Sequence, residues 1–84
     1  MESVELYKEV ALTRDIAAEN LKKGDVATLV EIVTHPSGGE DGAVLELFNA
    51  LGESIAVTVV PLSAIASLRA DQMPAVRPIH EPAA

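Results

Sequence analysis

The sequence contains no cysteine and no tryptophan, and it is also poor in basic residues. Without cysteine the chain forms neither disulfides nor thiolate zinc sites, which fits a reducing compartment. Only 6 Lys and Arg residues stand against 13 Asp and Glu, and the net charge is -7. Nucleic acids and anionic membranes bind mainly through clustered Lys and Arg. The composition therefore argues against both as partners.

A chain of 84 residues has room for one small domain. Its first residues include Glu2 and Glu5 where a signal peptide carries positive charge, and no apolar segment follows them. The longest uncharged stretch, residues 54–68, contains Pro61 and is shorter than the roughly 20 residues of a membrane-spanning helix. These features predict a cytoplasmic protein that does not cross a membrane.

Short apolar segments alternate with turn residues, and no segment has a helical period. The pattern predicts five strands, at residues 9–13, 26–34, 43–48, 54–60 and 66–68. Gly24 and Gly52 mark turns in which a positive φ is expected, and Asp25 completes the first of these turns. Neither alternate set within residues 26–34 is wholly apolar, which indicates a bulge or bend. We therefore predict an all-β fold, a small antiparallel barrel.

Alternation within the expected strands predicts which side chains face the core. The proposed core consists of Leu29, Ile32, Leu45, Leu47, Ile55, Val57 and Ile65. Val44, Phe48 and Val60 then point away from it, and an outward Phe either covers a sheet edge or anchors a partner. These three residues are the candidate interaction site.

Beyond residue 69 the composition changes. Pro74, Pro78 and Pro82 follow one another at intervals that exclude a helix and supply no strand. We predict a folded domain at residues 1–69 and a disordered, flexible Pro-rich tail at residues 70–84. A recognition segment for a groove on a partner is the alternative interpretation of the tail.

Three segments resemble a known family. They are residues 10–16 (VALTRDI), 21–32 (LKKGDVATLVEI) and 52–57 (GESIAV). Together they resemble the bacterial "domain of unknown function 4926" family over about residues 6–68, and the Gly24–Asp25 turn with its following strand also resembles SH3-like and KOW-type barrels. The resemblance implies a five-stranded SH3-like barrel but no particular function, because such barrels have many unrelated roles.

No catalytic or metal-binding constellation is evident in the sequence. His35 and His80 each lack a second ligand at a metal-site spacing. The adjacent acids Glu40 and Asp41 suit a hard cation chemically, but such a pair is more typical of a solubilising loop. We therefore predict no enzymatic activity, no metal and no other cofactor.

By elimination, the leading hypothesis is a small acidic interaction module. It would bind a protein partner, or a second copy of itself, through an exposed apolar strip with an acidic rim. An acidic protein that neutralises a more basic toxin or nuclease is one specific version. Two alternatives remain open, a KOW-like nucleic-acid or ribosome accessory protein and an accessory subunit of an enzyme complex. No small-molecule substrate is expected.

Overall fold

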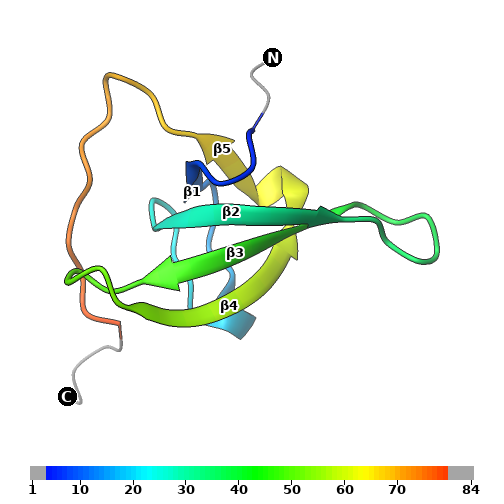
Figure 1. Cartoon of the computed structure of the whole chain (residues 1–84), viewed down its shortest axis with the longest axis horizontal. Helices are drawn as coiled ribbons and strands as arrows, with labels where there is room; N and C mark the ends of the chain where they lie inside the picture. The colour runs from blue at the N-terminus through cyan, green and yellow to red at the C-terminus, as the bar shows by residue number, and fades with distance from the viewer. Residues whose placement is uncertain (1–3, 80–84) are drawn as a thin grey trace.

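The computed structural model describes residues 4–79, which form five strands and two short 3₁₀ helices (Figure 1). The strands are β1 (Glu9–Leu12), β2 (Val26–Val33), β3 (Gly42–Phe48), β4 (Ser54–Pro61) and β5 (Ile65–Ser67), and the 3₁₀ helices are η1 (Ala17–Glu19) and η2 (Leu62–Ala64). Each of the five predicted strands is confirmed to within one residue at either end. None of the described elements is a helix with the length and apolar character needed to cross a bilayer.

All five strands belong to one antiparallel sheet with the order β4-β3-β2-β1-β5. Strands β1 to β4 follow one another across the sheet, and the chain then passes through η2 to place β5 beside β1. In Figure 1, β2, β3 and β4 lie in front while β1 and β5 lie behind, so the sheet is bent. Within residues 4–79, β4 and β5 are its edges and do not pair with each other. The fold is therefore all-β, with a single open sheet.

The core lies between the front and rear strands. Its largest fully buried side chains are Leu12, Leu29, Leu45, Val10 and Val60. The predicted burial of Leu29, Leu45 and Ile65 is confirmed, and Leu47 packs against the core while partly exposed.

The predicted irregularity in β2 is present, but one member of the predicted core on this strand is exposed. The irregularity expected in residues 26–34 is confirmed as a register shift between Leu29 and Glu31. An extra residue in one strand breaks the alternation of faces. Ile32 pairs with the buried Ala43 and so lies on the core side of the sheet, but it is 40% exposed, contrary to the prediction.

A second bulge overturns the predicted faces of β4. Ile55 and Val57 were expected in the core but are 44% and 62% exposed, whereas Val60, expected outside, is 1% exposed. The pairing runs Phe48 with Ser54 and then Leu47 with Ala56, so Ile55 is an extra residue in β4. Because successive side chains of a strand point to opposite faces, one inserted residue reverses every assignment beyond it.

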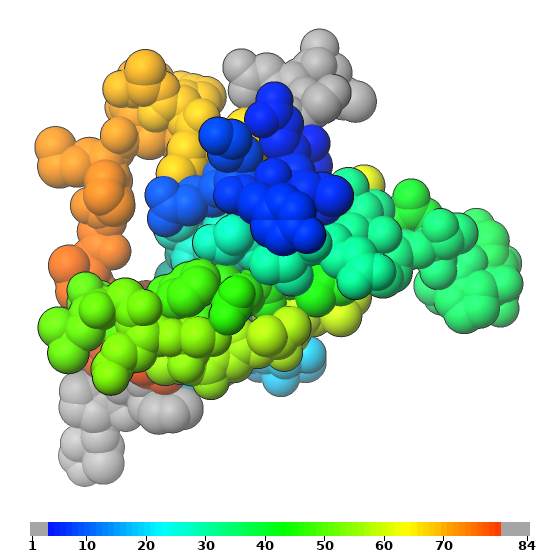
Figure 2. Space-filling model, viewed as in Figure 1, coloured from blue at the N-terminus to red at the C-terminus, as the bar shows by residue number. Residues whose placement is uncertain are grey.

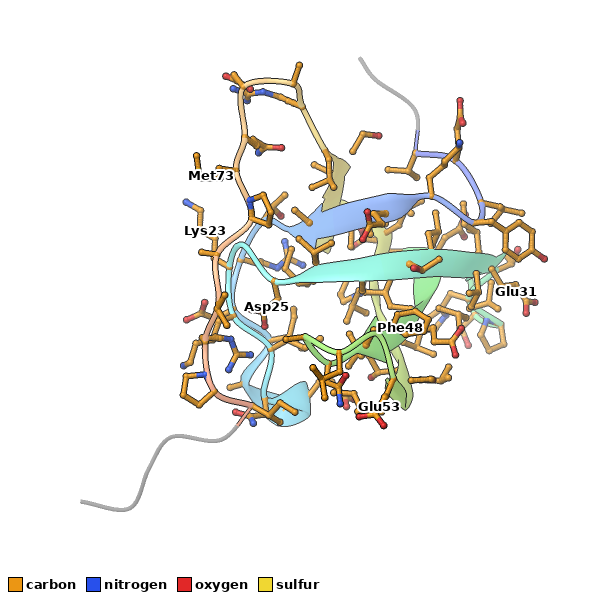
Figure 3. The ribbon with its side chains drawn as sticks, turned by 60° about the vertical axis from the view of Figure 1, so that its left-hand side comes forward. Lys23, Asp25, Glu31, Phe48, Glu53 and Met73 are labelled. Atoms are coloured by element: carbon orange, nitrogen blue, oxygen red, sulfur yellow. The ribbon has the colours of Figure 1, made fainter. Side chains whose placement is uncertain are left out.

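Residues 68–79 leave the sheet after β5 and form neither helix nor strand. In Figure 3 this segment, which includes Met73, runs past Lys23 and Asp25 on the turn that precedes β2. The Asn20 side-chain amide donates a hydrogen bond to the Ile79 carbonyl at 2.8 Å. The flexibility of the tail and the domain boundary after residue 69 stay predictions, and residues 80–84 lie outside the described part of the chain.

Candidate functional site

The turn between β3 and β4 is held by Asn49. Its side-chain oxygen accepts hydrogen bonds from the amides of Leu51 and Glu53, each at 3.0 Å, and its amide nitrogen donates to the Glu53 carboxylate at 2.8 Å. Gly52 has a φ of 82°, in the left-handed region that favours glycine, as predicted. These bonds set the first pair of the hairpin, Phe48 with Ser54.

Beyond this turn, four apolar side chains share the face of β3 and β4 that points away from the core. Phe48, Val57 and Val59 are 42%, 62% and 52% exposed, and Val44, which pairs with Val59, is half-buried. We call these four residues the outer strip. Figure 2 shows the molecule from the side on which β3 and β4 lie in front, with β4 in its lower part.

The candidate interaction residues are therefore only partly brought together. Val44 and Phe48 lie on the outer face as expected, while Val60 is buried in the core and cannot contact a partner. Sequence reasoning missed Val57 and Val59, which the bulge in β4 turns outward. No single residue signals that bulge, since both alternate sets of β4 contain apolar residues.

Carboxylates border the outer strip. Glu31 pairs with Val44 across β2 and β3, and Glu46 pairs with Val57 across β3 and β4. Glu46 accepts a hydrogen bond from the Ser54 hydroxyl at 2.6 Å. In Figure 3, Phe48 and Glu53 both lie at the β3–β4 hairpin.

The charge of this part of the chain is one-sided. Residues 26–61 contain five acidic residues and no Lys or Arg, and all six Lys and Arg residues fall within residues 8–23 and 69–77. The segment that forms β2, β3 and β4 therefore presents only negative formal charge at neutral pH, with histidine neutral. The electrostatic field of this negative charge attracts basic partners and repels acidic ones.

The turn before β2 is stabilised from two directions. Gly24 has a φ of 92°, as predicted, and its amide donates to the Leu12 carbonyl at 2.8 Å. The Asp25 carboxylate accepts a hydrogen bond from the Lys22 amide at 2.8 Å and two from the Arg77 guanidinium at 2.8 and 2.5 Å. Burial raises the pKa of Asp25, but the hydrogen bonds from Arg77 and the Lys22 amide outweigh it and hold that pKa below its ordinary value.

We expect Arg77→Gln to lower the free energy of unfolding at pH 7 by about 1 kcal/mol, because Asp25 would lose a partly buried ionic partner. A carboxyl whose pKa is lowered by folding stabilises the native state while ionised, and that contribution disappears as the pH falls through the native pKa. The stability of the variant should therefore decline less steeply than that of the wild type below about pH 5. Urea unfolding at a series of pH values measures this difference.

Arg69→Gln is the matched control for that experiment. Arg69 pairs with Asp71, but both side chains are exposed, and an exposed ion pair contributes little to stability. The pH profile of Arg69→Gln should follow that of the wild type. If the stability of Arg77→Gln also depended on pH as that of the wild type does, the contact between Arg77 and Asp25 would add nothing to stability.

The loop at residues 34–41 carries the other ionisable side chains considered from the sequence. Hydrogen bonds from the side chain and the backbone amide of Ser63 hold the pKa of Glu40 below its ordinary value. The distance from the Ser63 amide nitrogen to the Glu40 carboxylate oxygen is 2.6 Å. His35 accepts a hydrogen bond from the Ser37 amide through Nδ1 at 3.1 Å. A depression of about 400 Å³ lies between this loop and the end of β4. Within residues 4–79 no three His, Asp or Glu side chains are grouped to hold a metal ion, and His80 lies outside this range.

No protein-family model, curated protein or solved structure matches this chain. The resemblance to the "domain of unknown function 4926" family and to SH3-like barrels therefore stays a prediction. Function has to be inferred from the surface that the fold presents.

Proposed function

We propose that the protein is a non-enzymatic interaction module that binds a protein partner through the outer strip and the carboxylates beside it. Val57 and Val59 carry the proposal, because they remain 62% and 52% exposed on a strand that turns Thr58 inward between them. Fully burying a Val side chain contributes about 1.5–3 kcal/mol. In the free protein these side chains stay partly exposed, so part of this stabilisation is not realised. A partner that covers the outer strip would bury them and gain the remainder as binding energy.

Charge supports a basic partner for this surface. Glu31 and Glu46 lie next to the outer strip, and residues 26–61 hold no Lys or Arg to oppose them. Complementary charge accelerates association and excludes acidic competitors. An acidic protein that neutralises a basic toxin or nuclease is the specific form of the proposal. A KOW-like nucleic-acid protein is the weaker candidate, because phosphates are bound chiefly by Lys and Arg.

The proposal includes the SH3-like description of the fold. The strand order β4-β3-β2-β1-β5, the 3₁₀ helix between β4 and β5 and the bend that places β1 and β5 behind β2–β4 support it. The role as an accessory subunit of an enzyme complex, the cytoplasmic location and the bacterial origin stay predictions.

We expect Val57→Lys to weaken partner binding about 30-fold, because truncating or replacing an interface anchor costs about 2 kcal/mol or more. The substitution should leave the protein folded, since Val57 is 62% exposed and lies opposite Glu46, which forms a favourable cross-strand pair with a Lys. Tagged wild type and variant are used to capture partners from the source cells, and the affinity of a recovered partner is then measured by titration calorimetry.

Val76→Lys is the matched control, since it makes the same change in charge at a Val that is 89% exposed outside the outer strip. It should retain the partner. Equal affinity for all three proteins would contradict the proposal. Micromolar, salt-sensitive binding to DNA or RNA would contradict it in favour of the KOW-like alternative.

A further inference from the structure

We infer that the free edge of β4 binds an extended, basic segment of the partner as a sixth strand of the sheet. This inference rests on the proposed interaction module and adds to it the mode of binding and the chemistry of the partner.

The first observation is that the edge of β4 is open. In the described part of the chain β4 has a neighbouring strand on one side only. Residues 54–59 are all exposed except for half-buried Thr58. Proteins usually protect such an edge with charged residues, an internal Pro or a very short strand. β4 has eight residues, carries no charged side chain and contains Pro only at its last position.

The second observation concerns the backbone groups that face this edge. The Leu62 amide donates to the Asp41 carbonyl at 2.9 Å, which makes these residues a hydrogen-bonded pair next to the end of β4. In an antiparallel ladder, hydrogen-bonded and non-bonded pairs alternate. The pattern therefore directs the amide and carbonyl groups of Val57 and Val59 away from β3, toward the free edge. These are the same residues whose side chains are exposed on the outer face.

The third observation is the position of Glu46 beside Val57. A strand added to β4 would lie about 4.8 Å from it and about 9.6 Å from β3. An Arg or Lys on that strand, opposite Val57, lays its methylene groups over the Val side chain and brings its charge to the Glu46 carboxylate. Main-chain hydrogen bonds, apolar contact and an ion pair thus converge on one extended basic segment.

A second copy of this chain fits the edge less well than a basic segment. It would join two molecules that each carry a net charge of -7, and it would bring no Lys or Arg from residues 26–61 to Glu46. Like charges across an interface oppose association. The charge of the molecule therefore favours a basic partner.

The test uses the full chain and a synthetic peptide of about ten residues that alternates Arg with Val. Because successive side chains of a strand point to opposite faces, all Arg side chains of the bound peptide lie on the same face of the sheet. A peptide that alternates Glu with Val is its control. The readout is amide hydrogen exchange of Val57 and Val59, followed by NMR, with Thr58, whose amide points toward β3, as the internal reference. At about 90% occupancy we expect exchange at Val57 and Val59 to slow about tenfold, with no change at Thr58 and no effect of the Glu peptide.

Two variants test the ion pair. Glu46→Gln should weaken binding of the Arg peptide several-fold, whereas Glu19→Gln, which removes the same charge from η1, should leave it unchanged. Equal affinities for these two variants would overturn the assigned role of Glu46.

Three further outcomes would overturn the inference. The first is binding of the Arg peptide with unchanged exchange at Val57 and Val59, which would place the peptide on the outer face and leave the interaction module intact. The second is slowed exchange at both residues that depends on protein concentration without peptide, which would assign the edge to a second copy. The third is no binding of the Arg peptide at about 1 mM, a concentration that detects even weak association. Failure of the proposed function itself is detected separately, by full retention of the partner in Val57→Lys.

Discussion

Val60→Lys is expected to unfold the protein, whereas Val59→Lys is expected to leave it folded. The two residues are neighbours in β4, but Val60 is 1% exposed and Val59 is 52% exposed. A Lys at position 60 would place an ammonium group, or a neutral amine without a hydrogen-bond partner, inside the core. Either form costs several kcal/mol, a large part of the roughly 5–15 kcal/mol that stabilises a typical domain.

Urea unfolding and the NMR spectra of both variants measure this difference. We expect Val59→Lys to change the free energy of unfolding by less than about 0.5 kcal/mol, as is usual for exposed positions. The opposite result, an unfolded Val59→Lys and a stable Val60→Lys, would mean that the bulge at Ile55 is absent. The outer strip would then lose Val57 and Val59.

Leu45→Ala is expected to lower the free energy of unfolding by about 2–5 kcal/mol, since Leu45 is fully buried and its truncation leaves a cavity. It pairs with Leu29, which is equally buried, at the centre of the sheet. Phe48→Ala, on the same strand, removes more atoms but should cost only about 1 kcal/mol, because Phe48 is 42% exposed on the outer face.

Partner binding should respond in the reverse order. Phe48→Ala removes contact area from the outer strip, whereas Leu45→Ala leaves that surface unchanged while the protein stays folded. Urea unfolding and affinity for the captured partner are measured on both variants at a temperature at which each is folded. A larger loss of stability for Phe48→Ala than for Leu45→Ala would reverse the faces of β3.

Much of the fold was predictable because its signals are local. The five strands and their turns follow from short apolar segments between Gly and Pro residues, and Gly24 and Gly52 have the positive φ that their turns require. The alternation in β3 correctly placed Leu45 inside and Phe48 outside.

The faces of β4 were not predictable in the same way. The turn held by Asn49 pairs Phe48 with Ser54. Continued without interruption, that register would have turned Ile55 and Val57 inward, as predicted, and Val59 with them. The bulge after Ser54 shifts the pairing by one residue. Thr58 and Val60 thereby point inward, so half of the candidate site depends on a single inserted residue.

The sequence by itself determined the class of fold, the positions of the strands and turns, and the excess of negative charge over residues 26–61. Each of these depends on residues that are close together in the chain. Only the tertiary structure decided which side chains of β4 meet solvent and that Arg77 binds Asp25, 52 residues away. The reason is physical. Strand register and long-range ion pairs depend on how separate segments pack together, and the alternating pattern of β4 is compatible with either face until β3 selects its partners.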